Sequence, residues 1–203
     1  AGTAVALGSR DEARAQLVAE EIRQSWTDFA LDITGVSNDK AASSDLVILA
    51  TAFEAAAHTA TALSNELSGR VLISMANGMS RVGKEFQAIV PARGSIAATV
   101  QAALPETRVA AAFHHLPAKE FADIAHPIES DVLVCADDEE AAKTTIAFVE
   151  SIPGLRGLNA GSLAAAGALE ALTAVLVNVN VRYRCHTTLR LTEVSRPPDP
   201  SRP

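Results

Sequence analysis

The stretch AVALGSRDEARAQLVAEEIR, residues 4–23, decides the fold class. It reads as a short apolar strand over Ala4–Leu7, a Gly8-Ser9-Arg10 turn, and a helical pattern over about 11–24. A strand that passes through a short turn into a helix is the building unit of α/β proteins. The stretch therefore predicts an α/β protein with a βα unit near its N-terminus.

The same alternation continues along the chain. Short, nearly continuous apolar runs are separated by helix-like segments, which is typical of a parallel sheet covered on both faces. We predict strands at 45–51, 70–74, 108–114 and 131–136, a weaker strand at 155–160, and helices at 53–67, 94–103 and 138–150.

The sequence changes character after Pro153-Gly154. Residues 161–182 form one long helical pattern rich in Ala and Gly, with leucines and valines spaced three or four apart at Leu169, Leu172, Leu176 and Val179. Such a helix packs closely against another helix, either in the core or in a dimer interface. We expect an α/β domain over 1–152, a C-terminal helical region over 153–194 and a proline-rich disordered tail over 195–203.

Composition excludes several classes of partner. Among 203 residues, 48% are hydrophobic and 20% charged, and the formal net charge is −7. No basic stripe is available to neutralise phosphates, so we expect neither nucleic-acid nor membrane binding. The apolar run over 163–181 is interrupted by Glu170 and two asparagines, and we interpret it as a buried helix. Cys135 and Cys185 form no motif, and Cys135 lies in an apolar run, so we expect it to be a buried, inert thiol. Two cysteines without a signal peptide suggest a reducing cytoplasm.

Polar residues gather where the predicted strands end. Glycine, hydroxyl, amide and histidine side chains follow the strands at 8–10, 51–53, 75–81 and 114–119. Ligands of open parallel sheets bind beyond the carboxyl ends of the strands. This distribution favours a cofactor lying across the strand ends, although turns select some of the same residues.

The first of these turns bears on nucleotide choice. An NAD-binding fold places Asp or Glu after this strand, whereas Ser9 and Arg10 stand here and Arg14 follows one helical turn later. A hydroxyl and two guanidinium groups suit the 2′-phosphate of NADP. Alternatively, Ser9 caps the helix and the two arginines are solvated surface charges.

His114 and His115 are adjacent at the end of a predicted strand. Their side chains point to opposite faces, and no third ligand stands at a metal-like spacing, so we predict no metal site. One of the two histidines could face the cofactor crevice while the other is packed or exposed. No nucleophile–base motif or pair of catalytic carboxylates stands out, which favours a redox reaction in which the protein positions the reactants.

Five segments, in order, resemble one family. They are LGSRDEARA (7–15), SMANGMSRVGKEFQAIVPARGSIAATVQAALPE (74–106), AAFHHLPAKEFADIAHPIESDVLVCADD (111–138), SIPGLRGLNAG (151–161) and ALEALTAVLVNVNVRYR (168–184). Together they resemble the NADPH-dependent coenzyme F420 reductases, also called F420H2:NADP+ oxidoreductases. The similarity runs from the first residues to about Leu191.

We expect a cytoplasmic homo-oligomer, a dimer. The resemblance implies a Rossmann-like doubly wound sheet with a small C-terminal helical region, and an enzyme that transfers a hydride between NADP(H) and the deazaflavin coenzyme F420. It assigns the 2′-phosphate to Ser9, Arg10 and Arg14. It also places Thr51, Asn77, Met79 and Ala118 along the NADP path, and the deazaflavin near 114–118 and Leu189. No catalytic residue is assigned, and His114 is the candidate.

One departure concerns the start of the chain. The family opens with a strand, a glycine-rich turn and a helix, and the sequence here contains no such turn before residues 4–7. We therefore expect an N-terminally truncated chain of an enzyme that is active when complete, with a sheet that lacks its first strand, the one between 4–7 and 45–51. Two inner sheet edges would then be unpaired unless the flanking strands close up.

Two other functions remain open at the level of sequence. The chain could be a non-enzymatic NADP-binding or sensor domain, or an NADPH-dependent reductase of another acceptor, such as a flavin or a ferric chelate. Fold alone does not fix the substrate, and the sequence does not give the physiological direction of hydride transfer.

Overall fold

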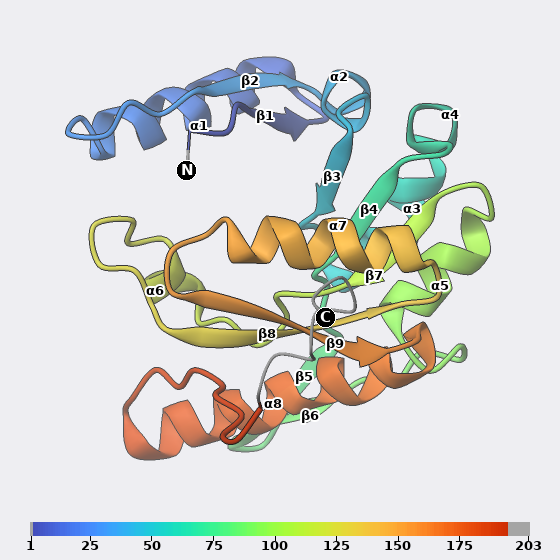
Figure 1. Cartoon of the computed structure of the whole chain (residues 1–203), viewed down its shortest axis with the longest axis vertical. Coiled ribbons are helices and arrows are strands. Elements are labelled where there is room, and N and C mark those ends of the chain that lie inside the picture. Colours follow the sequence, from blue (N-terminus) through green and yellow to red (C-terminus); the bar gives the residue numbers. More distant parts are fainter. Residues whose placement is uncertain (1, 195–203) are drawn as a thin grey trace, which may run out of the picture.

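The computed structural model describes residues 2–194, so the predicted disordered tail at 195–203 lies outside the described residues. Strands and helices alternate along the chain, which confirms the α/β class (Figure 1). The strands are β1 (Val5–Ser9), β2 (Ile33–Ser37), β3 (Leu46–Leu49), β4 (Val71–Ser74), β5 (Met79–Val82), β6 (Glu85–Ala88), β7 (Arg108–Ala111), β8 (Ser130–Ala136) and β9 (Leu155–Gly161). The helices are α1 (Glu12–Ser25), α2 (Asn38–Ala42), α3 (Phe53–Thr61), α4 (Ser64–Leu67), α5 (Ile96–Ala103), α6 (Ala118–Phe121), α7 (Glu139–Glu150), the 3₁₀ helix η1 (Leu163–Ala165) and α8 (Ala166–Tyr183).

The central sheet has five strands in the order β3-β4-β7-β8-β9. Its pairs are parallel as predicted, except that β7 and β8 are antiparallel. A parallel neighbour needs a crossover that returns the chain to the opposite edge, and residues 112–129 hold only the four-residue helix α6. The chain therefore enters β8 from the edge at which β7 ends.

Apolar layers cover both faces of this sheet. On one face, α3 and α5 pack Ala56, Ala60 and Val100 against Leu72 and Val109. On the other face, α7 packs its buried residues against a second cluster that includes Ile73, Val132 and Val134. This arrangement is the doubly wound architecture that the sequence predicts. Cys135 is also buried as expected, and burial raises the pKa of its thiol.

The N-terminal segment forms a separate two-stranded unit, drawn in blue in Figure 1. Strand β2, absent from the predicted strands, pairs in parallel with β1, and α1 packs on both. Gly35 allows this packing, because a Cβ there would lie 2.2 Å from the Ala15 carbonyl carbon.

The edges of β1 and β3 that would face a central strand are unpaired within residues 2–194. Strand β1 pairs only with β2, and β3 pairs only with β4, so the flanking strands do not close up. Apolar side chains of both strands are left uncovered, since Val5 is 49% exposed and Ile48 is 41% exposed. The described sheet therefore lacks the strand between β1 and β3, as expected.

Helix α8 packs against the hairpin β5–β6, which the sequence analysis did not predict. Asn178 of α8 accepts the backbone N–H of Phe86 at 2.7 Å and donates to its carbonyl oxygen at 2.8 Å. By length and composition, Leu163–Tyr183 is a helix that could cross a membrane. The interpretation as a buried helix holds only for the N-terminal half, because three apolar side chains further along are exposed, namely Val175, Val181 and Tyr183.

Candidate functional site

Three segments meet at the backbone carbonyl oxygen of His114, just beyond the end of β7. Asn77, in the loop after β4, donates its side-chain amide to this oxygen at 3.0 Å. Thr173 of α8 donates its hydroxyl to the same oxygen, also at 3.0 Å. The strands β4 and β7 are parallel neighbours, so their carboxyl ends bring the two loops together, and α8 closes the junction from the side.

The backbone before His114 is held in an unusual conformation. Phe113 has a φ of 68°, in the left-handed region that a bulky side chain rarely adopts. Its ring packs against Phe121 of α6 and Phe148 of α7, with ring centroids 6.3 Å and 6.0 Å away. Strain of this kind persists only where packing enforces it, and it gathers at functional sites. Sequence reasoning did not single out Phe113.

The two histidines have different surroundings. His115 is buried and donates its Nε2 proton to the backbone oxygen of Asp131 at 2.6 Å. His114 is also buried, and its Nε2 has no hydrogen-bond partner. Burial, with a smaller contribution from the neighbouring His115, lowers the pKa of His114 to about 3, and burial also lowers the pKa of His115. Both imidazoles are therefore neutral at physiological pH.

Unpartnered polar atoms follow the carboxyl edge of β3, β4 and β7. The hydroxyls of Thr51 and Ser74, Oδ1 of Asn77 and Nε2 of His114 are all buried without a hydrogen-bond partner. Buried polar groups in proteins are normally paired, so a row of open groups at the strand ends suits a bound polar ligand. Thr145, inside α7, is a contrasting case away from this edge. The residues present fit a cofactor that lies across the strand ends.

The other residues expected on the NADP path lie in the same loops. Met79 begins β5, immediately after the loop that holds Asn77, and is half-buried. Ala118 is the first residue of α6, four residues after His114, and is exposed. The structure thus brings Asn77 and His114 into contact, and places Thr51, Met79 and Ala118 at the same edge of the sheet.

The predicted 2′-phosphate group lies on the N-terminal unit. Ser9 ends β1, and its hydroxyl accepts the backbone N–H of Asp11 at 3.2 Å. Asp11 caps α1 by accepting the backbone N–H groups of Ala13 and Arg14, so Ser9 is not the helix cap. Arg10 precedes the helix and is exposed, as is the side chain of Arg14. Within residues 2–194, no hydrogen bond or ion pair joins this group to the His114 junction.

Leu189 belongs to a C-terminal strap, defined here as residues 185–194. Its carbonyl oxygen accepts the backbone N–H of Asp131 at 2.7 Å. Asp131 is fully buried at the start of β8 and pairs with Arg156 through two hydrogen bonds of 2.8 Å and 2.6 Å. The guanidinium of Arg156 holds the pKa of Asp131 below its usual range. Leu189 is expected from the sequence, whereas Asp131 and Arg156 are not.

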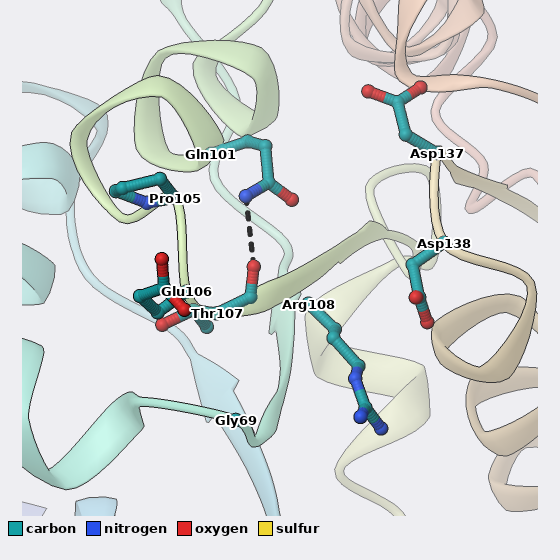
Figure 2. Close-up of a pocket in the computed structure, with 8 residues that line it drawn as sticks. All are labelled: Gly69, Gln101, Pro105, Glu106, Thr107, Arg108, Asp137 and Asp138. Atoms are coloured by element: carbon teal, nitrogen blue, oxygen red, sulfur yellow. Dashed lines mark hydrogen bonds between the residues drawn. The ribbon is translucent and has the colours of Figure 1, made fainter.

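A shallow pocket lies at the opposite edge of the sheet. It has a volume of about 480 Å³ and is drawn in Figure 2 at the amino ends of β4 and β7, near Gly69 and Arg108. Its polar groups serve the fold, since Gln101 donates to the Thr107 carbonyl and Asp138 caps α7. Ligands of open sheets bind at the carboxyl edge, so this pocket is not the candidate site.

Comparisons with known proteins identify the family and the fold. Residues 1–78 match the family model described as "NADP oxidoreductase coenzyme F420-dependent". The F420-dependent NADP reductase of Methanocaldococcus jannaschii is 31% identical over 196 residues, covering 94% of this chain and 88% of that protein. The enzyme of the same name from Methanothermobacter thermautotrophicus is 30% identical over 200 residues, covering 96% and 86%.

Solved structures support the fold. A putative F420-dependent NADP reductase from Arthrobacter superposes with a TM-score of 0.77 at 19% identity, over 94% of this chain and 89% of that one. A hypothetical protein from Sinorhizobium meliloti superposes with a TM-score of 0.63 at 20% identity, over 81% and 87%. At these identities the likeness shows a shared Rossmann-like fold alone. The sequence identity over nearly the whole chain shows more: this protein belongs to the family of F420-dependent NADP reductases.

Proposed function

We propose that this protein transfers a hydride between NADP(H) and coenzyme F420, at the carboxyl edge of β3, β4 and β7. Its family membership carries the proposal. The junction of Asn77, His114 and Thr173 supports the location, because it lies where the fold binds ligands and where buried polar atoms are left open.

When bound, NADP(H) and F420 supply both hydride carriers, so the protein need not supply an acid or base. Its part is to hold two rings in a reactive geometry and to exclude water. The junction suits this task, because Asn77 and Thr173 fix the backbone at His114 from two directions. The imidazole of His114 is buried and neutral. It can form a hydrogen bond with a ligand but brings no positive charge to the site. We propose His114 as a positioning group.

Different residues of the chain bind the two cofactors. Thr51, Asn77, Met79 and Ala118 border NADP(H), in loops that share one edge of the sheet. Ser9, Arg10 and Arg14 receive the 2′-phosphate, because two exposed guanidiniums and a hydroxyl at the end of β1 give charge and hydrogen bonds to that group. Leu189 borders the deazaflavin together with residues 114–118, and the strap that carries it is attached beside His115.

We also propose a homodimer that buries the C-terminal half of α8. The predicted helix pattern has an apolar face there that the rest of the described chain leaves open, with Val175 56% and Val181 60% exposed. Covering such a face is favourable, and a second copy offers a matching surface. We also keep the domain limits at 1–152 and 153–194 as a proposal. Strand β9 lies in the second of these regions and forms the edge strand of the central sheet. We expect a cytoplasmic protein.

The test is a stopped-flow measurement of F420 absorbance with NADPH under anaerobic conditions. The proposal expects bleaching of the deazaflavin with stoichiometric formation of NADP+. Tight NADPH binding with no F420 binding would instead identify a sensor domain. Bleaching of a flavin or reduction of a ferric chelate, without reaction of F420, would identify a reductase of another acceptor.

A further inference from the structure

The start of β8 lies at the same edge of the sheet as the end of β7. The two strands are antiparallel, with Ala111 opposite Cys135 and Ala110 opposite Ala136. Continuing this register by four residues brings His115 opposite Asp131, and the two are joined by the 2.6 Å hydrogen bond from His115 Nε2 to the Asp131 oxygen. Asp131 is therefore a direct neighbour of the loop after β7 that carries His114 and His115, called the histidine loop below.

Every hydrogen-bonding group of Asp131 is used. Its carboxylate accepts Arg156 at both oxygens, Arg190 at 3.3 Å and the backbone N–H of Leu191 at 2.7 Å. Its backbone N–H donates to the oxygen of Leu189. A buried carboxylate with this many donors is stable only when all of them are in place, so its geometry is closely fixed.

The partners of Asp131 fall into two groups. Leu189, Arg190 and Leu191 belong to the C-terminal strap, whereas His115 belongs to the loop after β7. Arg156 reinforces the first group, since its Nη2 also donates to the Leu191 oxygen at 2.8 Å and its Nη1 to the Val194 oxygen at 3.2 Å. Asp131 thus joins the strap to the histidine loop, and the neighbouring Ser130 adds hydrogen bonds between its hydroxyl and the backbone of Leu189.

We infer that Asp131, held by Arg156, is a positioning residue for the F420 site: it fixes the strap that carries Leu189 beside the loop that carries His114. It contacts neither cofactor and acts through these two segments. The inference rests on the proposed location of the F420 site. The ion pair of Asp131 and Arg156, which lies outside the site, keeps the strap and the histidine loop at a fixed separation.

Two variants loosen the strap in different ways. Asp131→Asn keeps the size of the side chain but removes the charge that Arg156 and Arg190 require. Leu191→Pro leaves the pair of Asp131 and Arg156 in place, removes the N–H that Asp131 accepts and restricts the backbone at residues 190 and 191. Glu129→Gln is the matched control, because it neutralises the exposed partner of Arg190, at 3.0 Å, keeps an acceptor there and leaves the carboxylate of Asp131 in place.

Two readouts are needed. Hydrogen–deuterium exchange of peptides from residues 185–194, measured without either cofactor, reports whether the strap is attached. Equilibrium quenching of F420 fluorescence gives the dissociation constant for F420 without turnover, and steady-state kinetics compare KM for F420 with KM for NADPH.

Both variants are expected to speed exchange in the strap and to raise the F420 dissociation constant and KM about tenfold, the equivalent of one net hydrogen bond. In both variants the KM for NADPH should stay within about twofold of the wild-type value. The Glu129→Gln control should stay within about twofold of wild type in its F420 dissociation constant and in both KM values. Unchanged exchange in both variants overturns the anchoring. Faster exchange with unchanged F420 affinity overturns the positioning role. A wild-type chain that binds NADPH but not F420 would instead overturn the proposed site, and the exchange data would still decide whether Asp131 anchors the strap.

Discussion

The side-chain amide of Asn77 donates a hydrogen bond to the backbone carbonyl oxygen of His114 over 3.0 Å. This bond joins the loops that follow two neighbouring strands, β4 and β7, at the edge where the fold binds ligands. The other polar atom of the same side chain, Oδ1, is buried without a partner. Asn77 therefore both shapes the site and leaves an acceptor open within it.

Asn77→Ala is expected to raise KM for NADPH about tenfold, because it removes an acceptor at the site and releases the two loops from each other. Steady-state kinetics at saturating F420 measure the change. Asn65→Ala, at an exposed position of α4 on the opposite edge, is the control and should match the wild type. Wild-type KM values for both cofactors in the Asn77→Ala enzyme would show that Asn77 is not part of the site.

Arg10→Ala is expected to weaken NADPH binding about tenfold or more and to change NADH binding little, because only NADPH carries the phosphate that a guanidinium would pair with. Isothermal titration calorimetry with both nucleotides measures the difference. Arg93→Ala is a control outside the N-terminal unit, since Arg93 is exposed in the loop before α5. Equal losses for NADPH and NADH would show that Arg10 does not contact the 2′-phosphate.

The strands of the central sheet could be predicted because each is a short apolar run, but two other elements could not. In β2, the residues Thr34 and Gly35 interrupt the apolar pattern, and the strand forms because β1 pairs with it. The hairpin β5–β6 is largely exposed, and Asn178 of α8 satisfies the backbone of Phe86 from far along the sequence. The local sequence pattern does not show that a segment will pair with residues far along the chain.

The candidate site shows the same division. The segments that hold Asn77 and His114 could be named from sequence because polar residues directly follow apolar strands there, whereas Asn77 itself was named through the family resemblance. Asp131 stands at the beginning of a strand, which in a parallel sheet would be the edge away from the site. Its place beside His115 follows from the antiparallel entry of β8, and that direction is set by the short connection through α6 rather than by the residues of β8.

Glu170 illustrates a buried charge that serves packing. Its two carboxylate oxygens accept the backbone N–H groups of Ile96 at 2.9 Å and Ala97 at 3.1 Å, at the N-terminus of α5. Glu170→Ala is expected to lower the free energy of unfolding by about 2 kcal/mol, because two donors are left unpaired. Glu170→Gln, which keeps one acceptor, should cost about half as much. Urea unfolding of the two variants measures both values.

Burial also raises the pKa of Glu170, so its contribution to stability falls as pH rises through that pKa. The Gln variant should lose this pH dependence, while its stability relative to the Ala variant is retained. Equal stabilities of the Ala and Gln variants would mean that the cap on α5 does not contribute.

His114 should make the protein sensitive to mild acid. Its pKa is lowered to about 3 in the folded protein by burial, from 6.5, so between these values the unfolded chain binds a proton that the folded chain does not. The free energy of unfolding therefore falls as pH drops below 6.5, by about 2 kcal/mol at pH 5 from this residue. Thermal unfolding of wild type and His114→Asn at pH 7 and pH 5 measures the difference.

The His114→Asn variant is expected to lose less stability than the wild type between these two pH values, even if it is less stable at pH 7. His58→Asn, at an exposed position of α3, is the control and should follow the wild-type pH dependence. Because the imidazole is neutral throughout this range, kcat should show no inflection due to His114 near pH 6.5. An inflection that disappears in His114→Asn would mean that the imidazole titrates in the enzyme and acts as an acid or base, which would overturn its role as a neutral positioning group.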